Sequence, residues 1–290
     1  MKKNFNRIAL DTNSFLKVYL RRQSRTELIK PMIYSLLPGG KKIRSKILID
    51  VGKIFSISYK TLIKLGAAVE CIHAYSLIHD DLPFMDDDDI RRGKLSTHKK
   101  FGEATAVLAG NSLLTLAFEI LCNKNLLLTE KIKIKLIKLI SKSSGHAGIA
   151  GGQFLDLKFE KKKIPINKII DMQIKKTGKL FAFCCLAPAI ISNKKQKIIN
   201  RLEKIGYEIG LLFQIVDDLI DYRGNSKKIG KKTKKDQKNG KATLLDLLGY
   251  QNTIKYVNKL KVSIFNKLKI FGNKSDNLKK TVLFIIERNR

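Results

Sequence analysis

The segment 202–221 restricts the fold of this 290-residue chain more than any other stretch. Its apolar residues recur with the spacing of a helix and cover most of the helix surface, so we expect the helix to be buried. Along this helix Gly210, Gln214, Asp217, Asp218 and Asp221 fall within one arc of roughly 100°. The sequence therefore predicts a buried helix with one acidic stripe.

The aspartates of this stripe need cations, because a carboxylate that is buried without a partner is costly. Asp217 and Asp221 are also i, i+4 neighbours, and like charges at that spacing repel. The stripe itself contains no lysine or arginine. A divalent metal meets this need, and carboxylate oxygens favour Mg²⁺ over softer ions. The alternative is a solvated helix face with compensating lysines from elsewhere in the chain.

Helical patterns account for most of the remaining sequence. They cover 8–22, 25–36, 42–56, 60–81, 104–122, 129–147, 167–191, 196–223, 243–249, 251–270 and 277–288. Segment 131–140 alternates enough to resemble a strand, but its apolar residues also fit helical spacing, and its helical neighbours favour a helix. The sequence shows no βαβ alternation, internal repeat or Gly/Ser-rich linker. We therefore predict an all-α bundle that forms a single domain over residues 1–290.

A second acidic cluster, HDDLPFMDDDDIRRG, runs from His79 to Gly93 and holds six aspartates. Pro83 disfavours helical geometry at the residue before it, so the preceding helix should end after Asp81. Two carboxylates then lie at a helix C-terminus, where the helix dipole disfavours negative charge. This placement needs a compensating partner, and a metal ion is the simplest one.

The arginines beside this cluster point to a polyphosphate ligand. The six acids outnumber Arg91 and Arg92 by three to one, so salt bridges cannot satisfy all of them. Mg²⁺ held by aspartates would bridge phosphate oxygens, while arginine side chains bind other oxygens. The motif GGKKIR indicates a further anion site, because its glycines permit close backbone approach and Lys41 and Arg44 supply charge. The sequence contains no P-loop motif.

The overall charge is strongly positive, with 58 lysines and arginines against 25 aspartates and glutamates. Such a charge is typical of proteins that bind nucleic acid or anionic membranes. The lysines are scattered, however, and lack interleaved aromatic residues for stacking bases, so we expect compositional drift and no nucleic-acid partner. We find no stretch with the roughly 18 apolar residues of a membrane span and no secretory signal. A soluble, cytoplasmic protein with buried, reduced cysteines is expected.

Together, the two aspartate-rich motifs, GGKKIR and GGQFLDL (151–157) resemble the trans-prenyltransferases, most closely the bacterial farnesyl diphosphate synthases. The resemblance extends over almost the whole chain, through AAVECIHAYSLIHDDLPFMDDDDIRRG, THKKFGEATAVLAGN, KKTGKL, FQIVDDLID and IIERNR. It implies an isoprenoid synthase-like fold of many helices around a deep central cavity. It also implies Mg²⁺ as cofactor, isoprenyl diphosphates as substrates and a homodimer.

The resemblance assigns roles to individual residues. Mg²⁺ would be held around the allylic diphosphate by Asp80, Asp81, Asp86, Asp217, Asp218 and Asp221. The allylic diphosphate would contact Arg91, Lys176 and Lys241, with Lys231 as a further candidate. Isopentenyl diphosphate would bind Lys41, Arg44, His73 and Arg92. The allylic pocket and its support would comprise Thr177, Gln214, Gln153 and Asp156. The residues expected to act directly in catalysis are Asp80, Asp81, Arg91, Lys176, Asp217 and Lys241.

The implied reaction condenses isopentenyl diphosphate with dimethylallyl and then geranyl diphosphate, giving farnesyl diphosphate. Mg²⁺ would assist ionisation of the allylic C–O bond, and the isopentenyl double bond would attack the carbocation. Tyr75 and the small Ser76, about one turn before Asp80, would limit product length in the farnesyl manner. A geranyl or geranylgeranyl diphosphate synthase of the same fold is the alternative. A terpene cyclase or a basic binding protein fits the motifs less well.

Some positions depart from the family pattern or receive a structural interpretation. Ser45 replaces the usual proline after GGKKIR, and GKATLL (240–245) lacks the usual proline of its loop. His79 lies beside Asp80 but off its helical face, so a structural hydrogen bond is expected there. His98 and His146 have no partner at metal-ligand spacing in the sequence.

Overall fold

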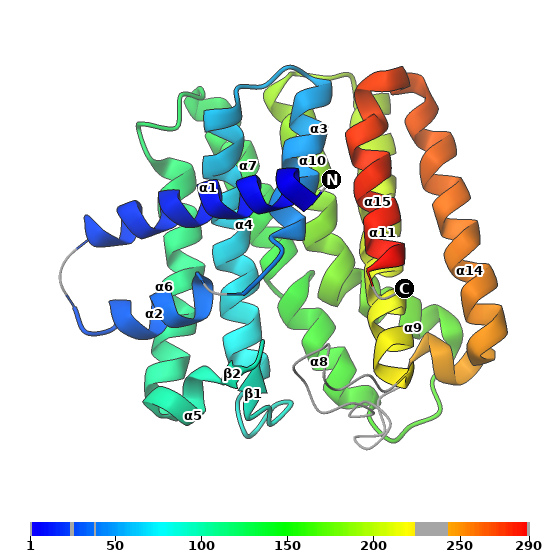
Figure 1. The fold of residues 1–290 in the computed structure, drawn as a ribbon, viewed down its shortest axis with the longest axis horizontal. Coiled ribbons are helices and arrows are strands. Elements are labelled where there is room, and N and C mark those ends of the chain that lie inside the picture. The colour runs from blue at the N-terminus through cyan, green and yellow to red at the C-terminus, as the bar shows by residue number, and fades with distance from the viewer. Residues whose placement is uncertain (1, 24–25, 38, 224–242, 289–290) are drawn as a thin grey trace.

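The computed structural model describes residues 2–23, 26–37, 39–223 and 243–288, and most of this part is helical (Figure 1). The helices are α1 (Lys2–Arg21), α2 (Ile29–Leu36), α3 (Ile43–Ile54), α4 (Tyr59–Asp80), α5 (Thr97–Phe101), α6 (Glu103–Cys122), α7 (Glu130–Ser144), α8 (Ile149–Phe159), α9 (Ile166–Gln173), α10 (Lys179–Ile191), α11 (Gln196–Arg223), α14 (Leu244–Leu268) and α15 (Asp276–Glu287). A π-helical turn, η1 (Ile174–Gly178), joins α9 to α10, and a 3-10 helix, η2 (Lys269–Ser275), joins α14 to α15. Strands β1 (Ile90–Arg91) and β2 (Lys94–Leu95) form a short antiparallel hairpin.

Helices α4, α10 and α11 form the centre of the bundle. Helix α10 packs against α3, α7 and α11, and α4 packs against α3 and α6. Every residue of α10 from Leu180 to Ala189 is buried, as its apolar sequence requires. The predicted all-α fold is confirmed.

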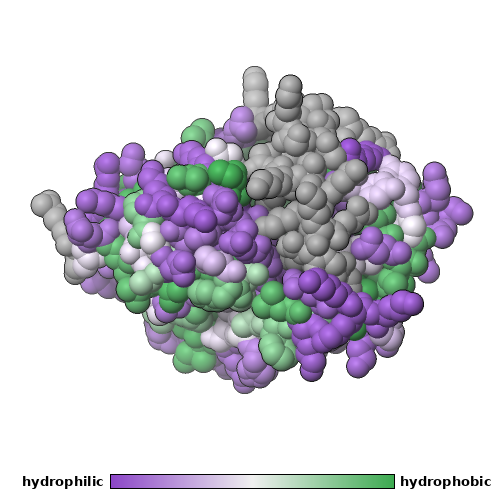
Figure 2. Space-filling model, turned by 90° about the horizontal axis from the view of Figure 1, so that it is seen from below, coloured by the Kyte–Doolittle hydropathy of each residue, from purple (hydrophilic) through white to green (hydrophobic). Residues whose placement is uncertain are grey.

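The two acidic segments lie at the same end of the molecule. Figure 1 shows α4 and α11 both running downward, with α8 between them at the lower end and the β1–β2 hairpin beside α4. Viewed from below, the described residues show hydrophilic side chains interspersed with apolar patches (Figure 2). The fold therefore places both aspartate motifs, the hairpin arginines and α8 at one end of the bundle.

Several elements differ from the sequence prediction. Helix α8 was not predicted, because Gly151 and Gly152 are poor helix formers and only packing against η1 compensates for them. The predicted helix 167–191 is divided by η1. The hairpin was not predicted either, since two residues a strand are too few to show alternation. The helical assignment of 131–140 is confirmed by α7, and a break near 250 is confirmed at Gly249, where φ is 72°.

Two helices, α4 and α6, are long and apolar enough to cross a membrane by length and composition alone. The most apolar window of α4 is 78% buried and that of α6 is 44% buried. The core helix of a soluble protein passes the same test, so this finding is weak support for a span. All four cysteines are free, and Cys122 is exposed, contrary to expectation, because it is the last residue of α6 on its outer side.

A buried ion pair within α3 is hydrogen-bonded to α15. The ammonium group of Lys46 contacts both carboxylate oxygens of Asp50, and Thr281 of α15 donates a hydrogen bond of 2.6 Å to the same carboxylate. Burial lowers the pKa of Lys46 and raises that of Asp50. Each charge is therefore stable in the interior only because the other is present.

Candidate active site

Helix α4 ends where Pro83 predicts, at Asp80, with Asp81 as the capping residue. The buried carboxylate of Asp81 accepts hydrogen bonds from the guanidinium group of Arg91, including one of 2.8 Å from Nε. Arg91 also donates a 2.9 Å hydrogen bond to Asp88. Two aspartates thus hold the first hairpin arginine in a fixed orientation at the end of α4.

Asp80 lies in a less favourable environment than its neighbour. Its pKa is raised to about 6, mainly because burial penalises the charged form and in smaller part because of the nearby Asp86. Lys176 and Arg91 act in the opposite direction. Burial has a larger effect on this pKa than the two cations, so an additional positive charge nearby would stabilise the ionised form of Asp80.

The loop after α4 is tied back to the end of the helix. The backbone nitrogens of Asp86 and Asp88 donate to the carbonyl oxygens of Asp80 (2.9 Å) and Asp81 (3.1 Å). The amide of Gln153 in α8 reaches the Asp86 carboxylate at 3.4 Å. The loop therefore presents Asp86 between the end of α4 and α8.

Helix α8 and the π-helical turn position a lysine beside the first acidic cluster. Lys176 of η1 donates a 2.6 Å hydrogen bond to Asp156 of α8 and lies close enough to Asp80 to lower its pKa. The contact depends on Gly152, where an added Cβ would lie 2.2 Å from the backbone nitrogen of Lys176. π-helical turns often occur at functional sites, and this one turns a lysine toward the acids.

A hydrogen-bond relay continues from η1 to α11. Thr177 donates to the side-chain oxygen of Gln214 at 3.3 Å, and the Gln214 amide donates to Asp218 at 3.0 Å. Asp218 is buried, whereas Asp217 is 44% exposed and forms a 2.7 Å ion pair with Arg288 near the C-terminus. Asp221 lies one turn further along the same face of α11.

The predicted basic site surrounds the turn before α3. The guanidinium group of Arg92 lies against Gly40, where an added Cβ would come within 3.1 Å of three of its atoms. Arg44 packs over the ring of Phe181 at 4.7 Å, and burial lowers its pKa. The glycines of GGKKIR therefore admit an arginine side chain from the hairpin.

His73 faces this basic site from α4. Burial and the neighbouring cations Arg44 and Arg92 hold its pKa well below the usual value, so the ring is neutral. Lys41, by contrast, is exposed and its ammonium group lies 5.1 Å from the ring centre of Phe284 in α15. The structure brings His73, Arg44 and Arg92 together and leaves Lys41 at their edge.

A buried glutamate balances these cations. Glu70 accepts a 2.9 Å hydrogen bond from the hydroxyl of Ser45 and forms a 3.7 Å ion pair with Lys42. Its charge also stabilises the charged forms of Arg44 and Arg92. Serine in place of the family's usual proline thus adds a hydrogen bond to this carboxylate.

The predicted product-length residues are both buried in α4. The hydroxyl of Tyr75 donates a 3.1 Å hydrogen bond to the carbonyl of Ser144, and burial raises its pKa to about 12. Ser76 donates to the carbonyl of His73 at 3.0 Å. His79 contacts the carbonyl of Val107 at 3.2 Å, which is the structural role expected of it.

Lys231 and Lys241 lie outside the described residues. A cavity of about 130 Å³ adjoins the first acidic cluster, with Asp81, Arg91 and Arg92 in its lining. A larger one of about 600 Å³ lies between α1, α4 and α6, and the lining residues are far from the aspartates in the fold. Of these two cavities, only the smaller is lined by predicted site residues.

Residues 25–277 match the family model for polyprenyl synthetases. The chain is 41% identical to a farnesyl diphosphate synthase of Micrococcus luteus over 281 residues, which are 97% of this chain and 95% of that protein. A solved structure of a FPP/GFPP synthase from Zymomonas mobilis superposes with a TM-score of 0.88, at 35% identity over 98% of this chain and 100% of that one. The solved structure of a geranyltransferase from Helicobacter pylori, complexed with magnesium and isoprenyl diphosphate, superposes with a TM-score of 0.84. It is 30% identical over 99% of this chain and 96% of that one.

The chain belongs to the polyprenyl synthetase family. This membership confirms the predicted family and enzyme class, a prenyltransferase that makes short-chain trans-prenyl diphosphates. Polyprenyl synthetases depend on Mg²⁺, and the donor set at this end of the bundle suits that ion. It consists of carboxylate oxygens on α4, its following loop and α11, the hard ligands that Mg²⁺ prefers.

Two residues that lie beside the predicted site residues were not singled out from the sequence. Glu70 carries no motif, although a lone acid within the apolar helix 60–81 is a usable signal that a cation must lie nearby. Asp88 was grouped with its neighbours, and only the structure shows that it orients Arg91. Arg288, in the segment IIERNR, was assigned no role from the sequence, and the structure pairs it with Asp217.

Proposed function

We propose that this polyprenyl synthetase makes farnesyl diphosphate by adding isopentenyl diphosphate to dimethylallyl and then geranyl diphosphate. The observation that carries the proposal is a continuous set of contacts between the two aspartate motifs. Gln153 joins Asp86 to α8, Asp156 joins α8 to Lys176, and Thr177 and Gln214 join η1 to Asp218. This arrangement surrounds a diphosphate with acids for metal and cations for phosphate oxygens.

The aspartates of both motifs would hold Mg²⁺, namely Asp80, Asp81, Asp86, Asp217, Asp218 and Asp221. Bound there, Mg²⁺ would withdraw charge from the allylic diphosphate and so make it a better leaving group. Support comes from the raised pKa of Asp80, since a carboxylate in need of positive charge is an effective cation ligand.

Arg91 and Lys176 would bind the allylic diphosphate and stabilise the negative charge that develops as the C–O bond breaks. Asp81 and Asp88 orient Arg91, and Asp156 orients Lys176. The isopentenyl double bond then attacks the allylic carbon, and a proton passes to the released diphosphate. A central cavity with apolar walls would exclude the water that could otherwise capture the cation.

Isopentenyl diphosphate would bind Arg44, Arg92 and His73, with Lys41 at the edge. His73 is neutral in this cationic site, so it can donate a hydrogen bond and would gain a proton only beside a bound anion. Glu70 keeps Arg44 and Arg92 charged. Lys231 and Lys241, outside the described residues, would complete the allylic site from their loop.

The test is an incubation of the purified protein with Mg²⁺, dimethylallyl diphosphate and isopentenyl diphosphate, followed by product identification by mass. We expect farnesyl diphosphate as the main product and its loss on addition of EDTA. A geranyl or geranylgeranyl product would keep the chemistry and overturn the product length. No condensation by a folded protein in Mg²⁺ would overturn the function.

The assembly and location are also part of the proposal. We propose a soluble, cytoplasmic homodimer of one domain per chain, without nucleic-acid partner or membrane span. Helix α6 supports the dimer, because it is highly apolar yet its most apolar window is only 44% buried, and Leu108 on it is 54% exposed. A partner surface would cover these side chains. Light scattering after gel filtration would test this, and a monomeric mass would contradict it.

A further inference from the structure

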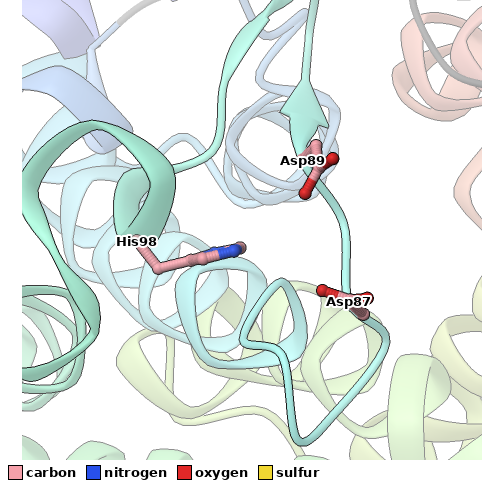
Figure 3. A group of neighbouring side chains, drawn as sticks. All are labelled: Asp87, Asp89 and His98. Carbon is pink, nitrogen blue, oxygen red and sulfur yellow. The ribbon is translucent and has the colours of Figure 1, made fainter.

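A separate group of potential metal ligands lies beside the hairpin. One potential ligand atom from each of Asp87, Asp89 and His98 lies within 4.8 Å of the others. Figure 3 shows the His98 ring pointing from α5 toward the loop that carries the two aspartates. None of these residues has a role in the proposed reaction.

The backbone holds the group in place. Strands β1 and β2 pair Ile90 with Leu95, and the nitrogen of Ser96 donates a 2.8 Å hydrogen bond to the carbonyl of Asp89. The chain thus folds back and brings His98 opposite Asp89. Asp87 has a left-handed backbone conformation (φ 48°), and its nitrogen is bonded to the carbonyl of Leu82 at 3.1 Å.

His98 has the arrangement of a metal ligand. The residue is 5% exposed, and its Nε2 atom is buried without a hydrogen-bond partner. The other nitrogen, Nδ1, lies 3.1 Å from the hydroxyl of Ser96. If Nδ1 carries the proton and donates it to Ser96, the lone pair of Nε2 is available to a cation. Ligating histidines in metalloproteins are fixed by the same kind of bond through their second nitrogen.

We propose that Asp87, Asp89 and His98 bind a borderline transition-metal ion such as Zn²⁺, separate from the Mg²⁺ of the proposed reaction. An imidazole nitrogen with two carboxylate oxygens suits Zn²⁺, whereas Mg²⁺ prefers oxygen ligands alone. Water would fill the remaining positions. The ion would clamp the hairpin to α5, and because the hairpin carries Arg91 and Arg92, it would restrain both arginines.

Small side-chain movements would close the site. Zn²⁺ ligands lie at about 2.0–2.2 Å from the ion, so the three atoms must approach one another. Asp87 and Asp89 are exposed and can rotate to do so. Lys99 forms a 3.1 Å ion pair with Asp89, with side chains 44% and 54% exposed. Exposed ion pairs of this kind are weak, so the metal can displace the lysine.

The test is a Zn²⁺ titration of isotope-labelled protein followed by histidine NMR, with Mg²⁺ present in large excess and no substrate. The chain has four histidines, so each ring can be assigned from single substitutions. We expect the Nε2 signal of His98 to shift and to saturate at one Zn²⁺ per chain. D89N and D87N, at exposed positions, should each abolish the saturable shift. S96A should weaken Zn²⁺ binding about 10–100-fold by releasing the ring.

E103Q is the matched control, because Glu103 is a nearby exposed acid outside the group, and it should bind Zn²⁺ as the unmodified protein does. An unmoved His98 signal would overturn the proposal. So would a D89N variant that retains the same His98 shift. The readout is metal binding to a named ring nitrogen, so the absence of Zn²⁺ binding would not contradict the proposed farnesyl diphosphate synthesis. Likewise, the absence of farnesyl diphosphate synthesis would not contradict Zn²⁺ binding at His98.

Discussion

Replacing Asp80 with asparagine should stabilise the metal-free protein while it abolishes condensation. The folded-state pKa of Asp80 is about 6 against an ordinary value of 3.8, mainly because of burial. An acid whose pKa is raised on folding contributes stability below its unfolded pKa and loses it as pH rises through the folded pKa. The charged Asp80 therefore costs stability above about pH 6.

The size of this cost follows from the two pKa values. A difference of about 2 pH units, at about 1.36 kcal/mol per unit, gives an upper bound of about 3 kcal/mol. Asp80 is partly accessible, so solvent screening reduces this to about 1–3 kcal/mol. Near neutral pH, the free energy of unfolding of D80N should exceed that of the unmodified protein by that amount. The difference should shrink toward zero near pH 4.

Urea unfolding in EDTA, at neutral pH and at about pH 4.5, measures this difference, because both proteins share every other titrating group. D171N is the matched control. Asp171 is 55% exposed and pairs with Lys175 at 2.7 Å, so its replacement should change stability by less than about 0.5 kcal/mol. A D80N variant no more stable than the unmodified protein at neutral pH would refute the reasoning. Adding Mg²⁺ and inorganic diphosphate should stabilise the unmodified protein and so reduce the difference in unfolding free energy between it and D80N.

Three further predictions concern other parts of the fold. K46M should lower the free energy of unfolding by about 3–5 kcal/mol, because it leaves the Asp50 charge buried alone. The double variant K46M/D50L should recover most of this loss in the same urea assay. A loss below about 1 kcal/mol in K46M would contradict the reasoning. Ser76→Phe should shift the main product toward geranyl diphosphate, and Tyr75→Ala should lengthen it; an unchanged product mass in both would remove this region from product-length control. Gly152→Ala places a Cβ 2.2 Å from the backbone of η1, so melting followed by circular dichroism should show about 1–3 kcal/mol of destabilisation, and a melting curve like that of the unmodified protein would contradict the close packing.

Local patterns predicted the helices that carry the acids. The acidic stripe of 202–221 and the stop at Pro83 depend on residues a few positions apart, and α11 and α4 follow both. Helix α8 could not be predicted in this way. Its glycines lower local helix propensity, and the packing that compensates comes from η1, about two dozen residues further on.

The sequence predicted which residues belong to the candidate site, but only some of the contacts between them. The motifs indicated that Asp80, Arg91 and Lys176 belong together, but no pattern indicated that Asp81 and Asp88 orient Arg91. The same holds for Glu70, whose cations come from the turn before α3 and from the hairpin. Arg91 lies 3 residues after Asp88 and 10 after Asp81, but the loop and hairpin between them have no regular period from which the contacts could be predicted. The cations near Glu70 come from other elements, so only the folded chain brings them to it.

Residue patterns alone were enough to predict an all-α chain, and they led us to propose that its scarce acids bind a metal and a diphosphate. Helical periodicity and the cost of buried charge are local properties, so they can be read residue by residue. Which cation each acid contacts, and that His98 faces Asp87 and Asp89, can be seen only in the folded chain. Those contacts depend on how the hairpin folds back and how helices pack, because only packing brings distant side chains within hydrogen-bond reach.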